Sequence, residues 1–214
     1  MTAAFRHEAL FYDGLDGFMD GLLPFVRAGV AAGEPTLVAV EREKIEALSG
    51  ALGEEAGAVD FVDMRAMGRN PGCIIPLWRA FVAEHAGDGG GVRGVGEPIW
   101  AGRSAAELDE CHRHEALLNV AFDDGPPWKL VCPYDAGALP AEVVEEARRT
   151  HPYVGTDSVT GRSDDYLGGR YETLAGELPP PPARREEVRF TRADLATVRT
   201  LFVASSFTAS TRSA

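Results

Sequence analysis

The chain has few cysteines and little positive charge, and both shortages narrow what it can be. Its 214 residues include three cysteines, Cys73, Cys111 and Cys132, an odd number without a CxxC pair. This pattern favours reduced thiols over a disulfide framework or a zinc site, so we predict no bound metal and no cofactor. The formal net charge is −12, from 21 lysines and arginines against 33 aspartates and glutamates. A chain without a broad basic field lacks the main source of nucleic-acid affinity, and we expect no nucleic-acid partner.

Long apolar runs and a phosphate-binding loop are missing as well. No stretch approaches the roughly 20 apolar residues that span a bilayer, and the N-terminus lacks the basic flank and apolar core of an export signal. We therefore expect a cytoplasmic protein without a membrane partner. The pattern GxxxxGK[ST] is absent, and the segment YDGLDGF carries Asp13 and Asp16 where a phosphate would be repelled. ATP hydrolysis in this region is disfavoured.

What the sequence does contain is an alternation of short apolar strands and amphipathic helices. Core strands are predicted at residues 8–12, 35–40, 59–64, 92–100 and 128–134. Helices are expected at residues 15–34, 41–52, 74–86, 104–122 and 139–151. Ser104 and Glu107 fit a capping box at the start of the fourth helix. Strands that are apolar on both faces and alternate with helices favour a three-layer α/β domain with a mostly parallel sheet, here over residues 5–155.

The composition changes after residue 155. Residues 156–187 are rich in Gly, Ser and Asp and then contain four consecutive prolines, which predicts a polar tail and a stiff Pro-rich linker. In residues 188–214, Leu195, Val198 and Leu201 recur at helical spacing before a low-complexity end. We expect a short helix that packs on a partner or frays, since an isolated amphipathic helix is marginal in water.

Polar residues close several of the predicted strands, and parallel sheets usually bind ligands at the carboxyl ends of their strands. The candidate ligand-binding residues are His7, Tyr12, Glu97, Trp100, Tyr134 and Asp135. Glu97 could bind a polar ligand group or act as a base, or it could cap a helix or pair with an arginine. Trp100 would supply an aromatic wall. His7 could face the same pocket or serve as a structural histidine.

One helix combines several side chains that bind metals in other proteins. Cys111 and His114 lie three residues apart on one helix face, but His112 points elsewhere and no second ligand pair is present. A structural role is therefore the preferred interpretation, with Glu115 and Asn119, at i and i+4, making polar contacts. We assign no catalytic residue and no metal ligand on this helix.

Two further residues have structural explanations. Cys132 ends a buried strand, where a small thiol packs well and need not react. His151 closes a helix, where a cation interacts favourably with the carboxyl-end dipole. The segment that contains them is therefore interpreted as the rim of a sensor pocket with a supporting helix, and not as a catalytic site.

Four segments together resemble the MEDS domain, the sensory domain named after the DcmR regulators of methanogens and methylotrophs. These segments are residues 5–40, GEPIW at 96–100, CHRHEALLNVAF at 111–122 and LVCPYDAGALPAEVVEEARRTHP at 130–152. The resemblance covers roughly residues 5–155. It implies a sensor of small molecules such as hydrocarbon derivatives, with a core similar to RecA-like folds.

The resemblance extends to the kind of protein in which such a domain occurs. In actinobacterial proteins of similar layout, the domain precedes a GHKL-type ATPase of the anti-sigma-factor kinase or histidine kinase kind. Residues 190–206 resemble the first helix of such an ATPase, but an Asn-bearing helix for magnesium and a glycine-rich lid do not follow. We therefore expect a truncated start of that domain and no kinase activity.

The leading hypothesis is a non-catalytic sensory or regulatory domain that binds a small molecule. It would act in two-component or anti-sigma-factor signalling, with a kinase or a sigma or anti-sigma regulator as protein partner. One alternative is a small hydrolase or transferase that uses Glu97, Asp135 and a histidine. Another is a protein-interaction module whose helix near residues 190–204 docks on a partner.

Overall fold

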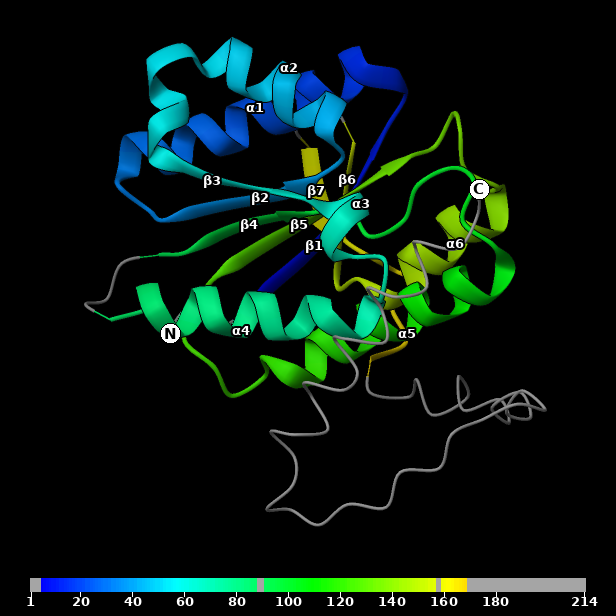
Figure 1. Cartoon of the computed structure of the whole chain (residues 1–214). Coiled ribbons are helices and arrows are strands. Elements are labelled where there is room, and N and C mark those ends of the chain that lie inside the picture. The colour runs from blue at the N-terminus through cyan, green and yellow to red at the C-terminus, as the bar shows by residue number, and fades with distance from the viewer. Residues whose placement is uncertain (1–4, 88–90, 157–158, 169–214) are drawn as a thin grey trace, which may run out of the picture. The chain divides into compact units, whose positions relative to one another are not determined.

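A seven-stranded sheet forms the centre of the structure, a computed structural model that describes residues 5–87, 91–156 and 159–168 (Figure 1). The strands are β1 (Arg6–Tyr12), β2 (Thr36–Val40), β3 (Val59–Asp63), β4 (Arg93–Gly96), β5 (Lys129–Asp135), β6 (Tyr153–Thr156) and β7 (Val159–Arg162). Their order is β3-β2-β4-β5-β1-β6-β7, and neighbours are parallel except for β6 with β7. The prediction of a mostly parallel sheet is confirmed.

Helices cover both faces of this sheet. They are α1 (Gly14–Ala32), α2 (Arg42–Leu52), α3 (Met64–Met67), α4 (Ile74–His85), α5 (Ala105–Ala121) and α6 (Ala141–Thr150), with 3₁₀ turns at Gly53–Ala58 and Pro71–Cys73. Figure 1 shows α1 and α2 on one face and α4, α5 and α6 on the other. Each face has its own apolar core, with Phe18 and Leu48 in the first and Trp78 and Leu118 in the second. The fold is thus the expected three-layer α/β arrangement.

The structure also corrects parts of the prediction. Strand β4 ends at Gly96, so residues 97–100 form a loop and not the end of a strand. The sheet continues beyond residue 155, because β7 pairs antiparallel with β6 in a region that was assigned to a polar tail. Both strands have only four residues and lack a clear apolar alternation, so periodicity did not reveal them. The predicted Pro-rich linker and C-terminal helix lie outside the described residues.

No helix in these described ranges has the length and apolar character needed to cross a membrane. The longest of these helices, α1, has 19 residues, and Asp16, Asp20 and Arg27 make its other face polar and exposed. It packs instead against the sheet, where Phe18, Leu22 and Val26 are fully buried. Helix α1 therefore serves as one of the covering helices of the domain.

Two glycines in β4 allow the large ring of Trp78 to lie against the sheet. A Cβ atom at Gly96 would come within 2.8 Å of Trp78 Cζ2, and one at Gly94 within 2.9 Å of Trp78 Cζ3. Trp78 comes from α4 and is 1% exposed, so its ring has little space into which it could move. The close approach of α4 to the centre of the sheet therefore depends on the absence of side chains at these positions.

We predict that Gly96→Ala lowers the free energy of unfolding by about 1–3 kcal/mol, because the added methyl overpacks the contact with Trp78. Urea unfolding followed by circular dichroism measures the change. Gly50→Ala is the matched control, since Gly50 lies in α2 with no atom within 4 Å of its added Cβ. Alanine in a helix should stabilise the fold slightly. Equal stability of Gly96→Ala and the wild type would contradict this packing role.

Candidate functional site

Three side chains meet at the carboxyl edge of the sheet, and we call them the strand-edge trio: Tyr12, Lys44 and Glu97. Tyr12 ends β1, Glu97 directly follows β4, and Lys44 lies in the first turn of α2. The Tyr12 hydroxyl donates a hydrogen bond of 2.6 Å to Glu97 Oε1. Lys44 Nζ donates to both partners, at 2.5 Å to Glu97 Oε1 and 2.7 Å to the Tyr12 hydroxyl. Each member therefore contacts the other two.

Burial sets the electrostatics of this trio. Glu97 is 1% exposed. Its burial raises the pKa of the carboxyl to about 7, although Lys44 and Tyr12 act in the opposite direction. Burial, together with the neighbouring Glu97, raises the pKa of Tyr12 far above its ordinary value, so the phenol stays a neutral donor. Within the described part of the chain, Glu97 Oε2 is buried without a hydrogen-bond partner.

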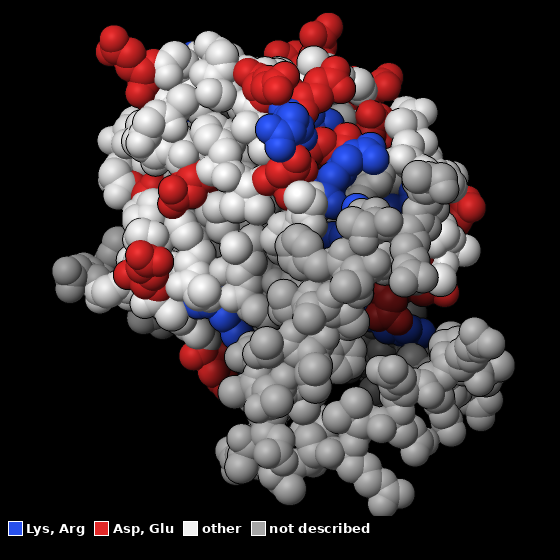
Figure 2. Space-filling model, in the orientation of Figure 1, with Lys and Arg blue, Asp and Glu red and all other residues white. Residues whose placement is uncertain are grey.

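Cationic and acidic side chains surround the trio on the same edge. Arg42 pairs with Asp63 at 3.0 Å, and Arg65 pairs with Glu41. Figure 2 shows lysines and arginines gathered among acidic residues on the face where α2 and α3 lie. This edge is therefore strongly polar but close to balanced in charge, which fits a polar ligand without a large charge of its own.

The loop after β4 is held by a buried arginine. Arg103 Nε donates to the Pro98 carbonyl at 2.7 Å, and its Nη2 donates to the Gly68 carbonyl at 2.8 Å. The same guanidinium lies 3.6 Å from the ring centre of Trp100, and the Arg65 guanidinium lies 5.2 Å from it. Trp100 is thus flanked by two cations, which fix its ring and leave it half-buried at the edge.

The other predicted site residues do not join the trio, although Asp135 lies at the same edge, opposite Tyr12 in the β1–β5 register. His7 precedes Tyr12 by five residues, about 17 Å along the strand, and its side chain faces the α5–α6 side of the sheet. Tyr134 is on that side too, with its ring 5.6 Å from His151. Asp135 Oδ1 accepts hydrogen bonds from the backbone of Gly137 and Ala138 and so closes the loop after β5. The structure brings together Tyr12 and Glu97, and it adds Lys44, which sequence reasoning missed.

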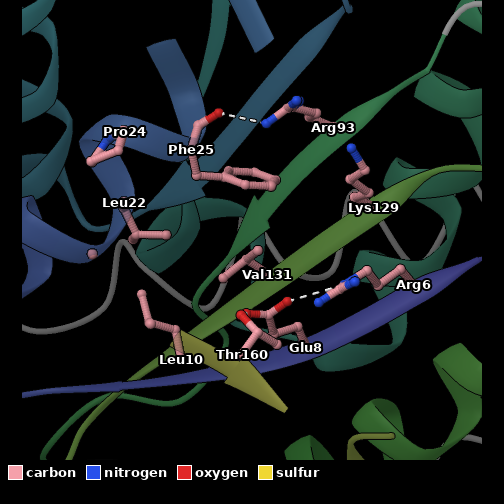
Figure 3. A pocket seen from close by; sticks show the side chains of 11 residues that line it. Arg6, Glu8, Leu10, Leu22, Pro24, Phe25, Arg93, Lys129, Val131 and Thr160 are labelled. Atoms are coloured by element: carbon pink, nitrogen blue, oxygen red, sulfur yellow. Dashed lines mark hydrogen bonds and ion pairs between the residues drawn. The ribbon is translucent and has the colours of Figure 1, made fainter. Parts of the chain in front are cut away.

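An open pocket of about 380 Å³ lies against the amino-terminal halves of β1 and β5 and against α1 (Figure 3). Its lining residues are Arg6, Glu8, Leu10, Gly21, Leu22, Pro24, Phe25, Arg93, Lys129, Val131 and Thr160. Glu8 is engaged by Arg6 at 3.3 Å and by the Thr160 hydroxyl at 2.5 Å. The Lys129 side chain is exposed and has no hydrogen bond or ion pair to a described residue. Arg6, Glu8 and Leu10 are alternate residues of β1, so their side chains lie on one face of the sheet. Two charged residues at alternate positions of an otherwise apolar strand are the sequence feature that could have indicated this pocket.

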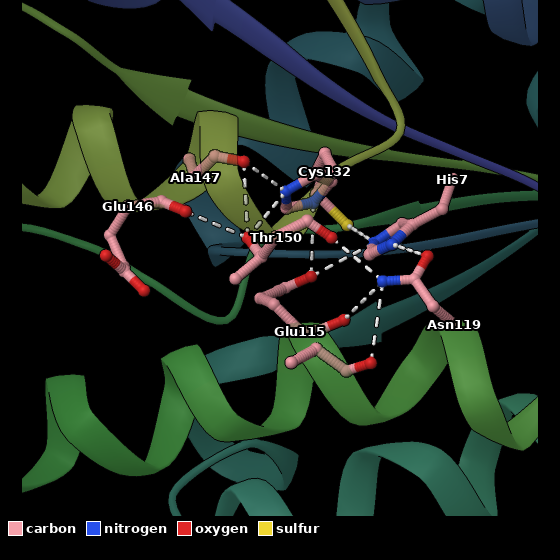
Figure 4. A network of polar contacts seen from close by, with 9 residues as sticks. His7, Glu115, Asn119, Cys132, Glu146, Ala147 and Thr150 are labelled. Atoms are coloured by element: carbon pink, nitrogen blue, oxygen red, sulfur yellow. Dashed lines mark hydrogen bonds and ion pairs between the residues drawn. The ribbon is translucent and has the colours of Figure 1, made fainter. Parts of the chain in front are cut away.

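A third polar feature, the buried cluster, consists of His7, Glu115, Cys132 and His151. All four side chains are about 0–1% exposed, and they lie between the sheet and helices α5 and α6 (Figure 4). His7 Nε2 lies 3.1 Å from Glu115 Oε2 and 3.4 Å from Cys132 Sγ. His151 Nε2 lies 3.3 Å from the same Glu115 oxygen. Asn119, one turn after Glu115, contacts His7 Nδ1, as the polar role predicted for these two helix residues requires.

Burial dominates the protonation equilibria of this cluster. It lowers the pKa of His7 to about 4, with His151 acting in the same direction. It also raises the pKa of the Cys132 thiol well above its ordinary value. Burial alone would raise the pKa of Glu115, but its contacts with His151 and His7 hold that pKa well below its usual range. Glu115 is therefore an ionised carboxylate without contact to solvent.

Residues 6–152 match the family model of the MEDS domain. The description of this family is "MEthanogen/methylotroph, DcmR Sensory domain". The chain belongs to the MEDS family. This is a family of sensory domains, so the protein has a sensory or regulatory role. The MEDS match contains the whole strand-edge trio and the whole buried cluster, and it ends before β6 and β7. A comparison with curated proteins found no match.

The raised pKa of Glu97 predicts a pH-dependent contribution to the stability of this MEDS domain. Its folded-state pKa of about 7 exceeds the ordinary glutamate value of 4.5, so folding takes up a proton between these values. Glu97 therefore destabilises the fold increasingly as the pH rises from about 5 to 7. Urea unfolding at several pH values should show that Glu97→Gln gains stability relative to the wild type across this interval. The same exchange at exposed Glu54 is the control, and parallel pH profiles for Glu97→Gln and the wild type would refute the prediction.

Proposed function

We propose that this MEDS domain is a non-catalytic sensor that binds a small molecule at the strand-edge trio and transmits the bound state to a protein partner. The observation that carries the proposal is the environment of Glu97. Its Oε1 is held by Tyr12 and Lys44, whereas Oε2 is buried and lacks a partner among the described residues. An unpaired buried acceptor is costly, and a ligand with an O–H or N–H group would remove that cost.

The chemistry of the edge suggests the class of ligand. Glu97 Oε2 offers an acceptor, and a raised carboxyl pKa allows the same group to donate when it is protonated. The flanked ring of Trp100 supplies an aromatic surface in the same loop. A small alcohol, amine or amide with a short apolar part matches these groups. The position also agrees with the general rule that open parallel sheets bind ligands at the carboxyl ends of their strands.

The geometry favours sensing over the hydrolase or transferase alternative. That reaction would require Glu97, Asp135 and a histidine in one place. Asp135 instead accepts backbone hydrogen bonds in the loop after β5, and His7 contacts Glu115 and Asn119 on the other side of the sheet. Within the strand-edge trio, Tyr12 stays protonated, so its phenol is not an activated nucleophile.

The output of the sensor is proposed from the family resemblance. A two-component or anti-sigma-factor system would place a kinase or a sigma or anti-sigma regulator downstream of the domain. Ligand binding at the strand edge would act on the loop after β4, which Arg103 ties to Gly68 before α4. Arg103 thus connects this loop to the segment between α3 and α4, and a bound ligand would change partner binding through this connection.

A ligand screen by thermal unfolding tests the proposal. A panel of small alcohols, amines, amides and nucleotides is compared on the wild type, on Glu97→Gln and on Lys129→Ala. A ligand at about 100 times its Kd stabilises the folded state by roughly 2.7 kcal/mol. We expect at least one alcohol, amine or amide to raise Tm in the wild type and in Lys129→Ala but not in Glu97→Gln.

The variant Lys129→Ala is the matched control because it alters the open pocket at the other end of the sheet. A Tm shift that is lost in Lys129→Ala and retained in Glu97→Gln would move the ligand site to that pocket. No shift with any compound, or shifts equal in all three proteins, would overturn the strand-edge site.

A further inference from the structure

The two histidines of the buried cluster present the same ring atom to its centre. His7 Nδ1 lies 3.1 Å from Asn119 Oδ1, and the Asn119 amide nitrogen donates to the Thr150 carbonyl at 2.8 Å, which orients the amide. His151 Nδ1 lies 2.8 Å from the Ala147 carbonyl. Both Nδ1 atoms therefore face acceptors. Neutral rings with their proton on Nδ1 would satisfy these acceptors and leave both Nε2 atoms as electron-pair donors for a metal ion.

Both Nε2 atoms point at the carboxyl group of Glu115. Each Nε2 lies near Glu115 Oε2, at 3.1 Å for His7 and 3.3 Å for His151. Cys132 Sγ lies 3.4 Å from His7 Nε2 (Figure 4). His151 Nε2 and Glu115 Oε1 have no hydrogen-bond partner among the described residues, although both side chains are fully buried. Four potential ligand atoms thus converge in one buried place, where a cation would replace the protons that they share.

The spacing of the donor atoms fits one tetrahedral ion. Zinc binds imidazole nitrogen and carboxylate oxygen at about 2.0–2.2 Å and thiolate sulfur at about 2.3 Å, which places tetrahedral ligand atoms about 3.3–3.6 Å apart. Three of the six separations between the donor atoms are 3.1, 3.3 and 3.4 Å. All four donor atoms lie within 4.8 Å of one another. Only small side-chain adjustments are needed to surround an ion.

We propose that His7, Glu115, Cys132 and His151 form a closed binding site for a divalent transition metal ion of the zinc type. His7 and His151 bind through Nε2 as neutral rings, while Asn119 and the Ala147 carbonyl hold the opposite ring nitrogens, the arrangement common around metal-bound histidines. Glu115 binds through a carboxylate oxygen. Cys132 binds as thiolate, and its proton passes to solvent when the metal enters.

Charge balance supports a divalent ion at this place. One carboxylate and one thiolate neutralise the two positive charges of the ion, so the buried site has no net charge. Without the metal, Glu115 is a fully buried carboxyl whose neighbours in the cluster are two imidazoles and a thiol, with no lysine or arginine among them. A buried uncompensated charge is strongly destabilising, and the metal would remove that cost.

The metal would join four separate elements on one side of the sheet. His7 lies in β1, Cys132 in β5, Glu115 in α5, and His151 directly after α6. With all four positions filled by protein and no exposure to solvent, the site has the features of a structural zinc centre and not of a catalytic one. The inference is independent of the strand-edge site, which uses the opposite face of the sheet.

Metal binding by the full chain tests the proposal. The purified protein is stripped with a chelator, dialysed against ZnCl₂ and analysed for metal content, and in parallel it is titrated with CoCl₂ under anaerobic conditions. We expect about one zinc ion per chain and a cobalt spectrum with a thiolate-to-metal charge-transfer band and tetrahedral visible bands. Zinc should also raise Tm. The proposal would be overturned if the wild type retained no zinc. It would also be overturned if cobalt bound without the charge-transfer band.

Two cysteine variants locate the site. Cys132→Ser removes the thiolate at nearly constant volume, whereas Cys111→Ser makes the same exchange at a buried cysteine that contacts the Pro98 carbonyl. We expect Cys132→Ser to lose the charge-transfer band and to bind zinc at least tenfold more weakly, with Cys111→Ser matching the wild type. Circular dichroism of the metal-free proteins verifies that both variants fold. Equal zinc affinity and equal cobalt spectra in all three proteins would exclude the buried cluster as the site.

Discussion

The central position of β1 is the constraint on which the rest of the structure depends. This strand pairs with β5 on one side and with β6 on the other, so its side chains can point only above or below the sheet. His7 faces the α5–α6 side, and Tyr12 faces the α1–α2 side. A register shift of one residue would exchange the two faces and remove both polar groups from their partners. The strand-edge trio and the buried cluster are therefore consequences of one strand register.

The domain buries two carboxyl groups, Glu97 and Glu115, and stabilises them in different ways. Glu97 is next to Lys44 and Tyr12, but desolvation still raises its pKa to about 7, so it can be neutral near physiological pH. Glu115 has no lysine or arginine in the buried cluster and is surrounded by histidines and a thiol. A protonatable carboxyl at the sheet edge suits reversible recognition of a ligand, because its charge can respond to what binds. A permanently ionised carboxylate in the core suits a fixed partner such as a metal ion.

Sequence reasoning succeeded where the signal was local. The alternation of apolar strands and amphipathic helices predicted the five core strands and the helices between them, because each signal lies within a window of about 10 to 20 residues. Ser104 and Glu107 form the predicted capping box, which depends on two residues three positions apart. Strands β6 and β7 were missed because four-residue strands with glycines carry too little periodic signal.

The sequence by itself determined the layered α/β architecture, the family and the presence of Tyr12 and Glu97 at strand ends. Only the tertiary structure decided which of the polar residues meet, because Lys44 reaches Glu97 across 53 positions and His7 reaches Glu115 across 108. Contacts over such separations depend on strand order and on the face to which each side chain points, and neither property is encoded in a local pattern. For the same reason Cys132 and His151, which had separate local explanations, are found together in one buried cluster.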